Sequence, residues 1–157
     1  MLLISLGFWQ LDRAGEKRAI EDQIASANSG DVGLVDSAEF LKDKEYYHVR
    51  LQGSYIGVKQ FIYDNQIVDQ ISGYYVLTPL VLKGDSKAVL INRGFIPWNG
   101  RRDKLADIDV GAKLTEVKVQ ISKPVRRMEL EESKTTGEFP VLIQTLDLDE
   151  MSNTASL

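Results

Sequence analysis

Two apolar runs on either side of a short polar turn constrain the fold of this chain more than any other stretch. The runs, residues 73–82 and 87–97, are rich in β-branched and aromatic side chains, and residues 83–86 between them contain a Gly-Asp pair that is typical of a chain reversal. The first run is apolar on both faces, as expected of a strand with a neighbour on each side. The pattern predicts an antiparallel hairpin whose first arm lies in the middle of a β-sheet.

The second arm of this hairpin is interrupted by the polar sequence Asn92-Arg93-Gly94. Strict alternation places Arg93 on the same face as Ile91 and Phe95. A charge buried among apolar side chains must be paired or hydrogen-bonded, because an isolated charge in a dry core is very costly. We therefore expect Arg93 to be buried and bonded, and Gly94 to mark a bulge or the close approach of another backbone.

Composition limits the classes of function that the chain can have. A length of 157 residues with 43% hydrophobic side chains fits one domain with a substantial core. The formal net charge of −4 argues against nucleic-acid binding, which requires a basic surface. The absence of cysteine excludes disulfides and thiol chemistry, and the single histidine, His48, excludes any site that needs two imidazoles from one chain.

The first nine residues are apolar and end in Trp9, but they are far fewer than the roughly 20 needed to span a bilayer. They also lack the charged start and the cleavage site of a signal peptide. Three interpretations stay open: a buried strand or helix start, a cloning remnant, or the end of a transmembrane helix with Trp9 at the headgroup level. A polar helix with a thin apolar stripe is predicted over residues 12–27, and it favours the third interpretation.

Most of the remaining chain is predicted to be β-structure. Alternating or apolar runs predict strands over residues 45–56, 59–68, 114–123 and 141–146. A turn is expected at Asp64-Asn65, an exposed aromatic at Trp98, and short helices at residues 36–41 and from Asp147 onward. We expect a mainly β fold in which six or seven antiparallel strands form a small barrel or a tight sandwich, with one N-terminal α-helix.

The residue patterns contain no enzyme signature. Asp147, Asp149 and Glu150 resemble part of a calcium loop, but Ser152 stands where that loop requires glycine, so no metal site is expected. No Gly-x-Ser-x-Gly elbow or phosphate-binding glycine loop is present. Thr78 is the best available hydroxyl nucleophile for a hydrolase, yet no activating base lies near it in the sequence.

Three blocks of this sequence, in order, resemble the motifs of one protein family. The blocks are residues 6–17 (LGFWQLDRAGEK), 73–80 (GYYVLTPL) and 89–97 (VLINRGFIP). They are similar to the LGxWQLxRxxEK, GYxVxTPL and VLVNRGFVP motifs of the Surfeit locus protein 1 family, also called Shy-type proteins. A weaker Tyr-x-Val and Gly-x-Tyr block begins at Tyr47 and Gly53. Because all four occur in the family's order, the chain is identified as resembling this family.

The resemblance implies an assembly factor for haem-copper cytochrome c oxidase that is not an enzyme. Family members have one membrane helix at each end and a mostly β domain between them. The resemblance implies that residues 1–11 are the remnant of the first membrane helix, and that residues 12–157 are one soluble envelope domain, cut before a second membrane helix. It also implies a place in the bacterial inner membrane facing the periplasm, or alternatively in the mitochondrial inner membrane. The implied partner is oxidase subunit I, with no nucleic acid; no cofactor is expected in this fragment, and haem A is expected only for the full-length protein.

Six residues of the matched blocks are candidate binding residues. They are Trp9, Gln10, Arg13, Tyr74, Asn92 and Arg93. One interpretation is that they act as conformational staples where the membrane helix meets the sheet. The other is that some of them face a haem propionate or the oxidase surface near the bilayer. The alternative function is that of a generic small-barrel envelope module that binds a peptide, lipid or glycan.

Overall fold

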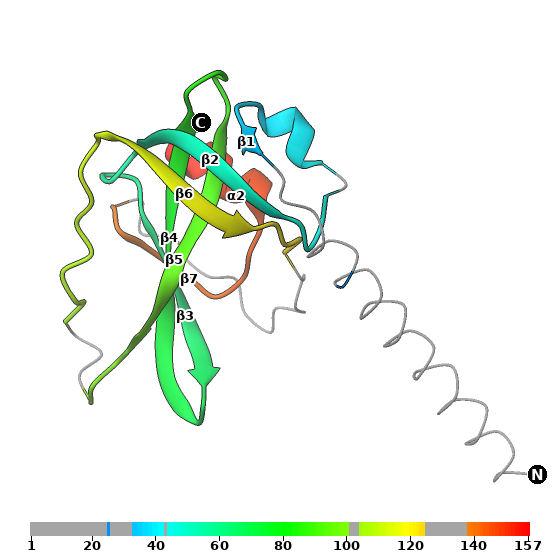
Figure 1. Ribbon diagram of the computed structural model, residues 1–157. Coiled ribbons are helices and arrows are strands. Elements are labelled where there is room, and N and C mark those ends of the chain that lie inside the picture. The colour runs from blue at the N-terminus through cyan, green and yellow to red at the C-terminus, as the bar shows by residue number, and fades with distance from the viewer. Residues whose placement is uncertain (1–24, 26–32, 43, 101–103, 125–137) are drawn as a thin grey trace, which may run out of the picture.

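The computed structural model describes residues 25, 33–42, 44–100, 104–124 and 138–157, which form one curved sheet with a short C-terminal helix (Figure 1). The elements are β1 (Leu34–Val35), the 3₁₀ helix η1 (Ala38–Leu41), β2 (His48–Tyr55), β3 (Phe61–Val68), β4 (Ile71–Leu82), β5 (Ala88–Pro97), β6 (Leu114–Gln120), β7 (Val141–Ile143) and α2 (Leu148–Ala155). The mainly β prediction is therefore confirmed. The helix predicted over residues 12–27 lies outside the described residues apart from Ala25.

Strand β4 is the centre of the sheet, as the hairpin pattern predicts. It pairs antiparallel with β5 from Gly73↔Pro97 to Val81↔Ala88. Its other edge is shared, because β3 pairs with it as far as Leu77 and β2 pairs with it from Leu80 onward. One strand therefore sets the register of three others.

Pro79 lies where this shared edge of β4 passes from β3 to β2. Its carbonyl accepts a hydrogen bond of 2.9 Å from the Ile56 amide, which directly follows β2. The carbonyl and the nitrogen of one strand residue point to the same edge, and proline has no N–H to donate. A proline inside a central strand is tolerated here because its missing N–H falls at the point where one ladder ends and the next begins.

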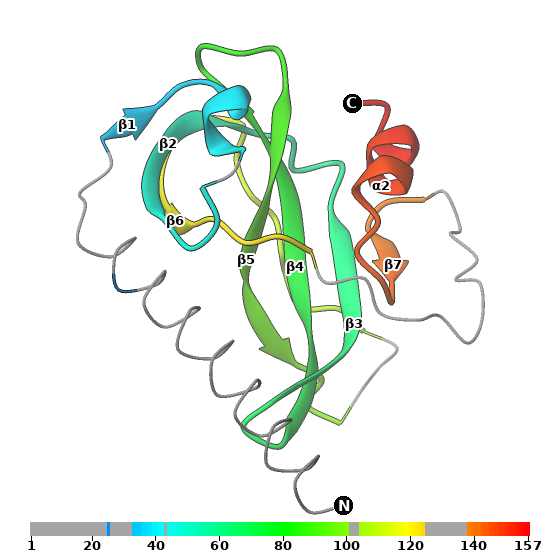
Figure 2. The ribbon, with the colours of Figure 1, turned by 90° about the vertical axis from the view of Figure 1, so that its right-hand side faces the viewer.

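The expected antiparallel barrel or sandwich is wrong in two respects. The sheet is mixed, because β1 pairs parallel with β2 and β7 pairs parallel with β3. It is also not closed, because β5 and β6 pair only with β4 and β2 respectively in the described part of the chain. Figure 2 shows the reason: β2 and β6 curve away from β4 on one side, whereas β7 and α2 lie beyond β3 on the other.

Local polar residues account for the two short helices. Asp147 caps α2 by accepting hydrogen bonds from the amides of Asp149 and Glu150, which confirms a helix there and gives the Asp147 carboxylate a structural role. The short helix predicted over residues 36–41 is the 3₁₀ helix η1, and its capping residue is Ser37, because the Ser37 hydroxyl accepts from the Glu39 amide.

The turn predicted at Asp64-Asn65 is instead an irregularity within β3. Pairing with β4 shifts register between Tyr63 and Gln66, and Asn65 has a φ of 56°. The chain reverses later, at Asp69-Gln70, where both residues have positive φ. Asn and Asp tolerate the left-handed conformation, so this sequence fits either a turn or a bulge.

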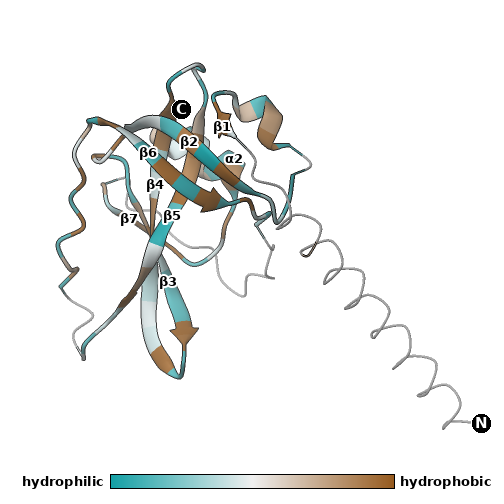
Figure 3. Ribbon diagram, in the orientation of Figure 1, coloured by the Kyte–Doolittle hydropathy of each residue, from teal (hydrophilic) through white to brown (hydrophobic). Residues whose placement is uncertain are grey.

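Three apolar clusters form the core, and the hydropathy of the strands follows them (Figure 3). The first joins β3, β4 and β7 to Met151 and Ala155 of α2. The second joins β1, β2, β4 and β5, and the third joins Tyr74 of β4 to Trp98 after β5. Trp98 is only 6% exposed, so the expected exposed aromatic is wrong: its ring packs on Tyr74 and its Nε1–H donates to Asp64.

Gly53 allows β2 to pair with both β4 and β6 at one position. A Cβ atom on Gly53 would lie 2.3 Å from the Val81 carbonyl oxygen. We expect Gly53→Ala to lower the free energy of unfolding by about 2 kcal/mol, because the backbone of β4 cannot retreat without losing other pairs. Gly111→Ala is the control, since nothing lies within 4 Å of its Cβ position; equal losses in urea unfolding would contradict the prediction.

Asp85 ties the β4–β5 turn to η1. Its carboxylate accepts from the amides of Ala38 at 2.9 Å and Lys87 at 3.1 Å, and these backbone hydrogen bonds, that of Ala38 first, lower the pKa of Asp85 below 3.8. A lowered folded-state pKa contributes stability that is present above the unfolded-state pKa and is lost as the pH falls through the folded-state value. Asp85→Asn should therefore lower the melting temperature at pH 7, and the deficit should shrink below about pH 3.8.

Thermal unfolding followed by circular dichroism at both pH values measures this difference. The control is Glu138→Gln, which changes an exposed carboxylate that has no hydrogen bond or ion pair in the part of the chain described. A deficit for Asp85→Asn that is unchanged in acid would contradict the assigned role.

Candidate functional site: the Arg93 network

The polar interruption in β5 is a β-bulge. Leu77 pairs with Asn92 and Tyr75 pairs with Phe95, so β5 carries one more residue than β4 between these pairs. Gly94 has a φ of 124°, a conformation that side-chain-bearing residues rarely adopt, and its amide donates to the Asn92 side chain at 3.0 Å. The bulge predicted at Gly94 is confirmed, and it breaks the alternation that would have placed Arg93 in the core.

Arg93 is exposed, which corrects the expectation that it is buried, yet its guanidinium is bound to fixed acceptors. Nη1 donates to the Gln60 side-chain oxygen at 2.9 Å and to the Ile108 carbonyl at 2.7 Å. The guanidinium carbon also lies 5.8 Å from the centre of the Tyr55 ring, within the range of a cation–π contact. Arg93 therefore connects the bulge of β5, the start of β3 and the loop before β6.

Gln60 and Thr78 are the buried part of the same network. Gln60 is 5% exposed and Thr78 is fully buried. The Thr78 hydroxyl donates to the Gln60 oxygen at 2.9 Å, so that this one oxygen receives hydrogen bonds from both Thr78 and Arg93. The Gln60 amide donates in turn to the Ile108 carbonyl at 3.3 Å. Each polar group is satisfied, as burial in a core requires.

The pKa of Tyr55, which lies beside Arg93 in this network, is shifted. Burial raises the pKa of its hydroxyl, because the charged phenolate is disfavoured away from water, and the positive charge of Arg93 opposes the rise. The phenol therefore stays neutral at physiological pH, and the face of its ring is available to the guanidinium.

Tyr74 does not join this site. Its side chain is 1% exposed, its hydroxyl accepts from the Ala106 amide at 3.0 Å and its ring centre lies 4.5 Å from that of Trp98. Tyr74 thus holds the loop before β6 against β4. Of the other candidate residues, Asn92 and Arg93 lie side by side in the bulge, whereas Trp9, Gln10 and Arg13 lie outside the described residues.

Sequence reasoning missed Gln60, which is the organising residue of the network. It stands immediately before the apolar run of β3, in the position of an ordinary polar strand flank. Its partners Thr78, Arg93 and Ile108 are 18, 33 and 48 residues away. No local pattern distinguishes such a residue, and only its near-complete burial marks it.

The loop that Arg93 binds also lines an open cavity of about 510 Å³. Val58 and Phe139 contribute apolar wall, and Gln60, Ile108 and Asp109 also line it. Gln60 and Ile108 are therefore shared between the cavity wall and the anchor of Arg93.

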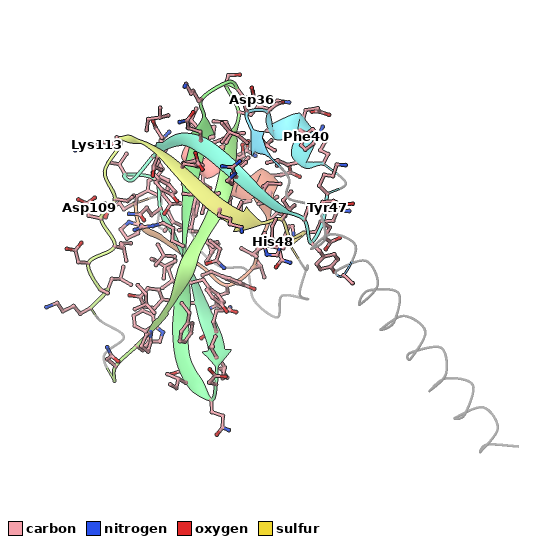
Figure 4. The ribbon with its side chains drawn as sticks, in the orientation of Figure 1. Asp36, Phe40, Tyr47, His48, Asp109 and Lys113 are labelled. Carbon is pink, nitrogen blue, oxygen red and sulfur yellow. The ribbon has the colours of Figure 1, made fainter. Side chains whose placement is uncertain are left out.

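The described residues contain no arrangement typical of catalysis. No group of three or more His, Asp or Glu side chains could hold a metal ion there. The Thr78 hydroxyl is buried and donates to an amide oxygen, which is not a base. Figure 4 places His48 and Asp109 on opposite sides of the molecule, so the only histidine is remote from the loop that Arg93 binds. No helix among the residues described is long and apolar enough to cross a bilayer.

The sequence of this chain was compared with models of known protein families. The model described as the SURF1 family matches residues 1–156, which is nearly the whole chain. The chain belongs to the SURF1 family. The resemblance of residues 6–17, 73–80 and 89–97 to Surfeit locus protein 1 is thereby confirmed.

SURF1-like proteins of Rickettsia are among the similar curated relatives. That of Rickettsia felis is 28% identical over 165 residues, covering 99% of this chain and 67% of the relative. Those of Rickettsia conorii and Rickettsia prowazekii are both 33% identical, over 106 and 107 residues, covering 66% of this chain and 41% of each relative. The chain thus spans only part of the length of these SURF1-family relatives. No solved structure matches it.

The buried hydrogen bond between Thr78 and Gln60 gives the testable prediction of this site. Thr78→Val keeps the shape of the side chain and removes its O–H donor, so we expect the free energy of unfolding to fall by about 1 kcal/mol. Thr115→Val on β6, where Thr115 is partly exposed, should change it by less than about 0.5 kcal/mol. Urea unfolding measures both, and equal effects would show that the Thr78 hydroxyl contributes nothing specific.

Proposed function

We propose that this SURF1-family chain is the folded domain of an assembly factor for haem-copper cytochrome c oxidase, and that it acts by binding and not by catalysis. The observation that carries the proposal is the family match over residues 1–156. The absence of a metal cluster or an activated nucleophile among the residues described supports a binding role. We propose oxidase subunit I as the partner, with placement of haem A by the full-length protein as part of the same step.

The proposed location is the bacterial inner membrane, with this domain in the periplasm and membrane helices flanking it. The apolar residues 1–9 and the bacterial origin of the similar relatives support this location. The alternative is the mitochondrial inner membrane. In either case the domain would stand at the membrane surface, where subunit I is exposed outside the bilayer.

The candidate binding residues divide into two groups in this proposal. Arg93 and Asn92 are exposed on the bulge and are the proposed contacts with a partner. Tyr74 supports the fold from inside, because its hydroxyl and ring are both engaged. Trp9, Gln10 and Arg13 are proposed to act at the junction with the membrane.

A second candidate function is that of a generic envelope module that binds a small ligand, and the cavity of about 510 Å³ favours it. The cavity has apolar walls and few polar groups, as ligand sites commonly do. The two functions differ in their readout, since a ligand module would leave the content of assembled oxidase unchanged when its gene is deleted.

The experiment is complementation of a bacterium whose own SURF1-family gene is deleted, using the complete reading frame of this protein. We expect the wild-type gene to restore haem a absorbance, subunit I in the membrane and cytochrome c oxidase activity, because assembly requires the missing factor. NADH dehydrogenase activity in the same membranes is the control for general damage. A stably expressed protein that restores none of the three would contradict the proposal.

A further inference from the structure

The Arg93 side chain has one edge that the protein leaves unused. Nη1 carries two hydrogens, and both are donated, to Gln60 and to Ile108. The opposite edge of the planar group, formed by Nε and Nη2, has no hydrogen-bond partner in the described part of the chain. That edge presents two parallel N–H groups, which is the arrangement that binds a carboxylate through both of its oxygens.

The positive charge of Arg93 also has no acidic partner among the described residues. The ion pairs there join Lys42 and Lys87 to Glu39, Arg50 to Glu116 and Lys123 to Glu45. An ordinary surface arginine moves freely and loses side-chain entropy when it is bound. Arg93 differs because two hydrogen bonds hold one edge and the Tyr55 ring lies against its face, so most of that entropy is already lost in the free protein.

The neighbourhood of Arg93 has the composition of a protein–protein contact. Arginine and tyrosine are enriched among the residues that dominate binding energy at interfaces. The bulge exposes Asn92, Arg93 and Gly94 together, and a Cβ on Gly94 would meet nothing within 4 Å, so a partner can approach the backbone closely. An anionic bilayer is a poorer match, because one cation on a chain of net charge −4 gives little attraction to a charged surface.

We propose that the free Nε and Nη2 edge of Arg93 binds an Asp or Glu side chain of a protein partner, with Gln60, Thr78 and Ile108 as positioning groups. The identity of that partner as oxidase subunit I rests on the proposed function. The carboxylate specificity rests on the geometry of Arg93 alone.

The carboxylate specificity is tested in the chain of 157 residues labelled with ¹⁵N. The probe is the peptide acetyl-Gly-Glu-Gly-amide, with acetyl-Gly-Gln-Gly-amide as the neutral control. We expect the Arg93 Nε–H signal to respond to the Glu peptide at about tenfold lower concentration than that of Arg50, which already pairs with Glu116. Equal responses at the two arginines would overturn the proposal.

Two further titrations distinguish other anions. A stronger response of Arg93 to vesicles of phosphatidylglycerol would assign the edge to a lipid phosphate and overturn the proposal. A response to gallium protoporphyrin IX, a diamagnetic haem analogue, without one to the Glu peptide would assign it to a porphyrin propionate, with the same consequence.

The partner is tested by capture of oxidase subunit I from membranes that contain the complete protein. Arg93→Lys keeps the charge and removes the planar pair of donors, so we expect about tenfold less subunit I in the crosslinked product. Arg50→Lys makes the same substitution at an exposed position and should capture as the wild type does. Gly53→Ala weakens the fold at the pairing of β2 with β4 and changes no member of the Arg93 network, so it separates loss of stability from loss of the contact.

Failure of the inference about Arg93 and failure of the proposed assembly function give different experimental results. Full capture by Arg93→Lys, or an equal loss with Gly53→Ala, would overturn the inference and leave the assembly function intact. A wild-type protein that neither restores the oxidase nor captures subunit I would overturn the proposed function and the partner named here, whereas the peptide titration would still decide the carboxylate site.

Discussion

Backbone pairing along both edges of β4 is the constraint on which the rest of this structure depends. One edge carries β5 along most of its length, and the other carries β3 and then β2. A change in the register of β4 would therefore move all three strands and the apolar clusters between them. Pro79 marks the point where the shared edge changes partner, and the Ile56 amide binds its carbonyl there. Beyond this point β2 pairs with β4 through Gly53, Ser54 and Tyr55, and its other edge pairs with β6.

The same strand places a polar network beneath the surface. Thr78 lies beside Pro79, fully buried, and its hydroxyl binds the Gln60 oxygen that Arg93 also binds. Burying two polar side chains is unfavourable unless their hydrogen bonds are made, and in this network they are made. The result is a guanidinium whose position is determined by the core, although the group itself lies at the surface.

The sequence predicts the parts of this fold that depend on local patterns. The hairpin of β4 and β5, the bulge at Gly94, the alternating strand β6 and the helix after Asp147 all have such patterns, and all are present. The sequence does not show whether the sheet closes into a barrel. Closure depends on how far β2 and β6 curve, and this curvature is set by packing. The prediction that Trp98 is exposed is wrong for a related reason. The Asn and Gly that follow it indicate a turn, but contacts with Tyr74 and Asp64 bury its ring.

In the candidate site, too, local patterns are visible in the sequence and contacts between distant residues are not. The motif that contains Asn92 and Arg93 is visible in the sequence, and so is the need of Arg93 for hydrogen-bonding partners. The exposure of Arg93 is not visible, because the bulge reverses the alternation after Ile91, and Gln60 is not visible, because its partners are distant in the chain. Tyr74 belongs to the matched block but serves the interior, so membership of a motif did not distinguish a structural residue from a surface contact.

The open ends of the sheet have a consequence for solubility. An unpaired strand edge can recruit the same edge of another copy and start aggregation. On β5 the bulge at Gly94 interrupts the row of backbone donors and acceptors, and Pro97 supplies no donor at the end of the strand. On β6 the exposed positions include Glu116 and Lys118, whose charges disfavour stacking of a second sheet. In the described part of the chain, these edges of β5 and β6 are thus poor templates for self-association.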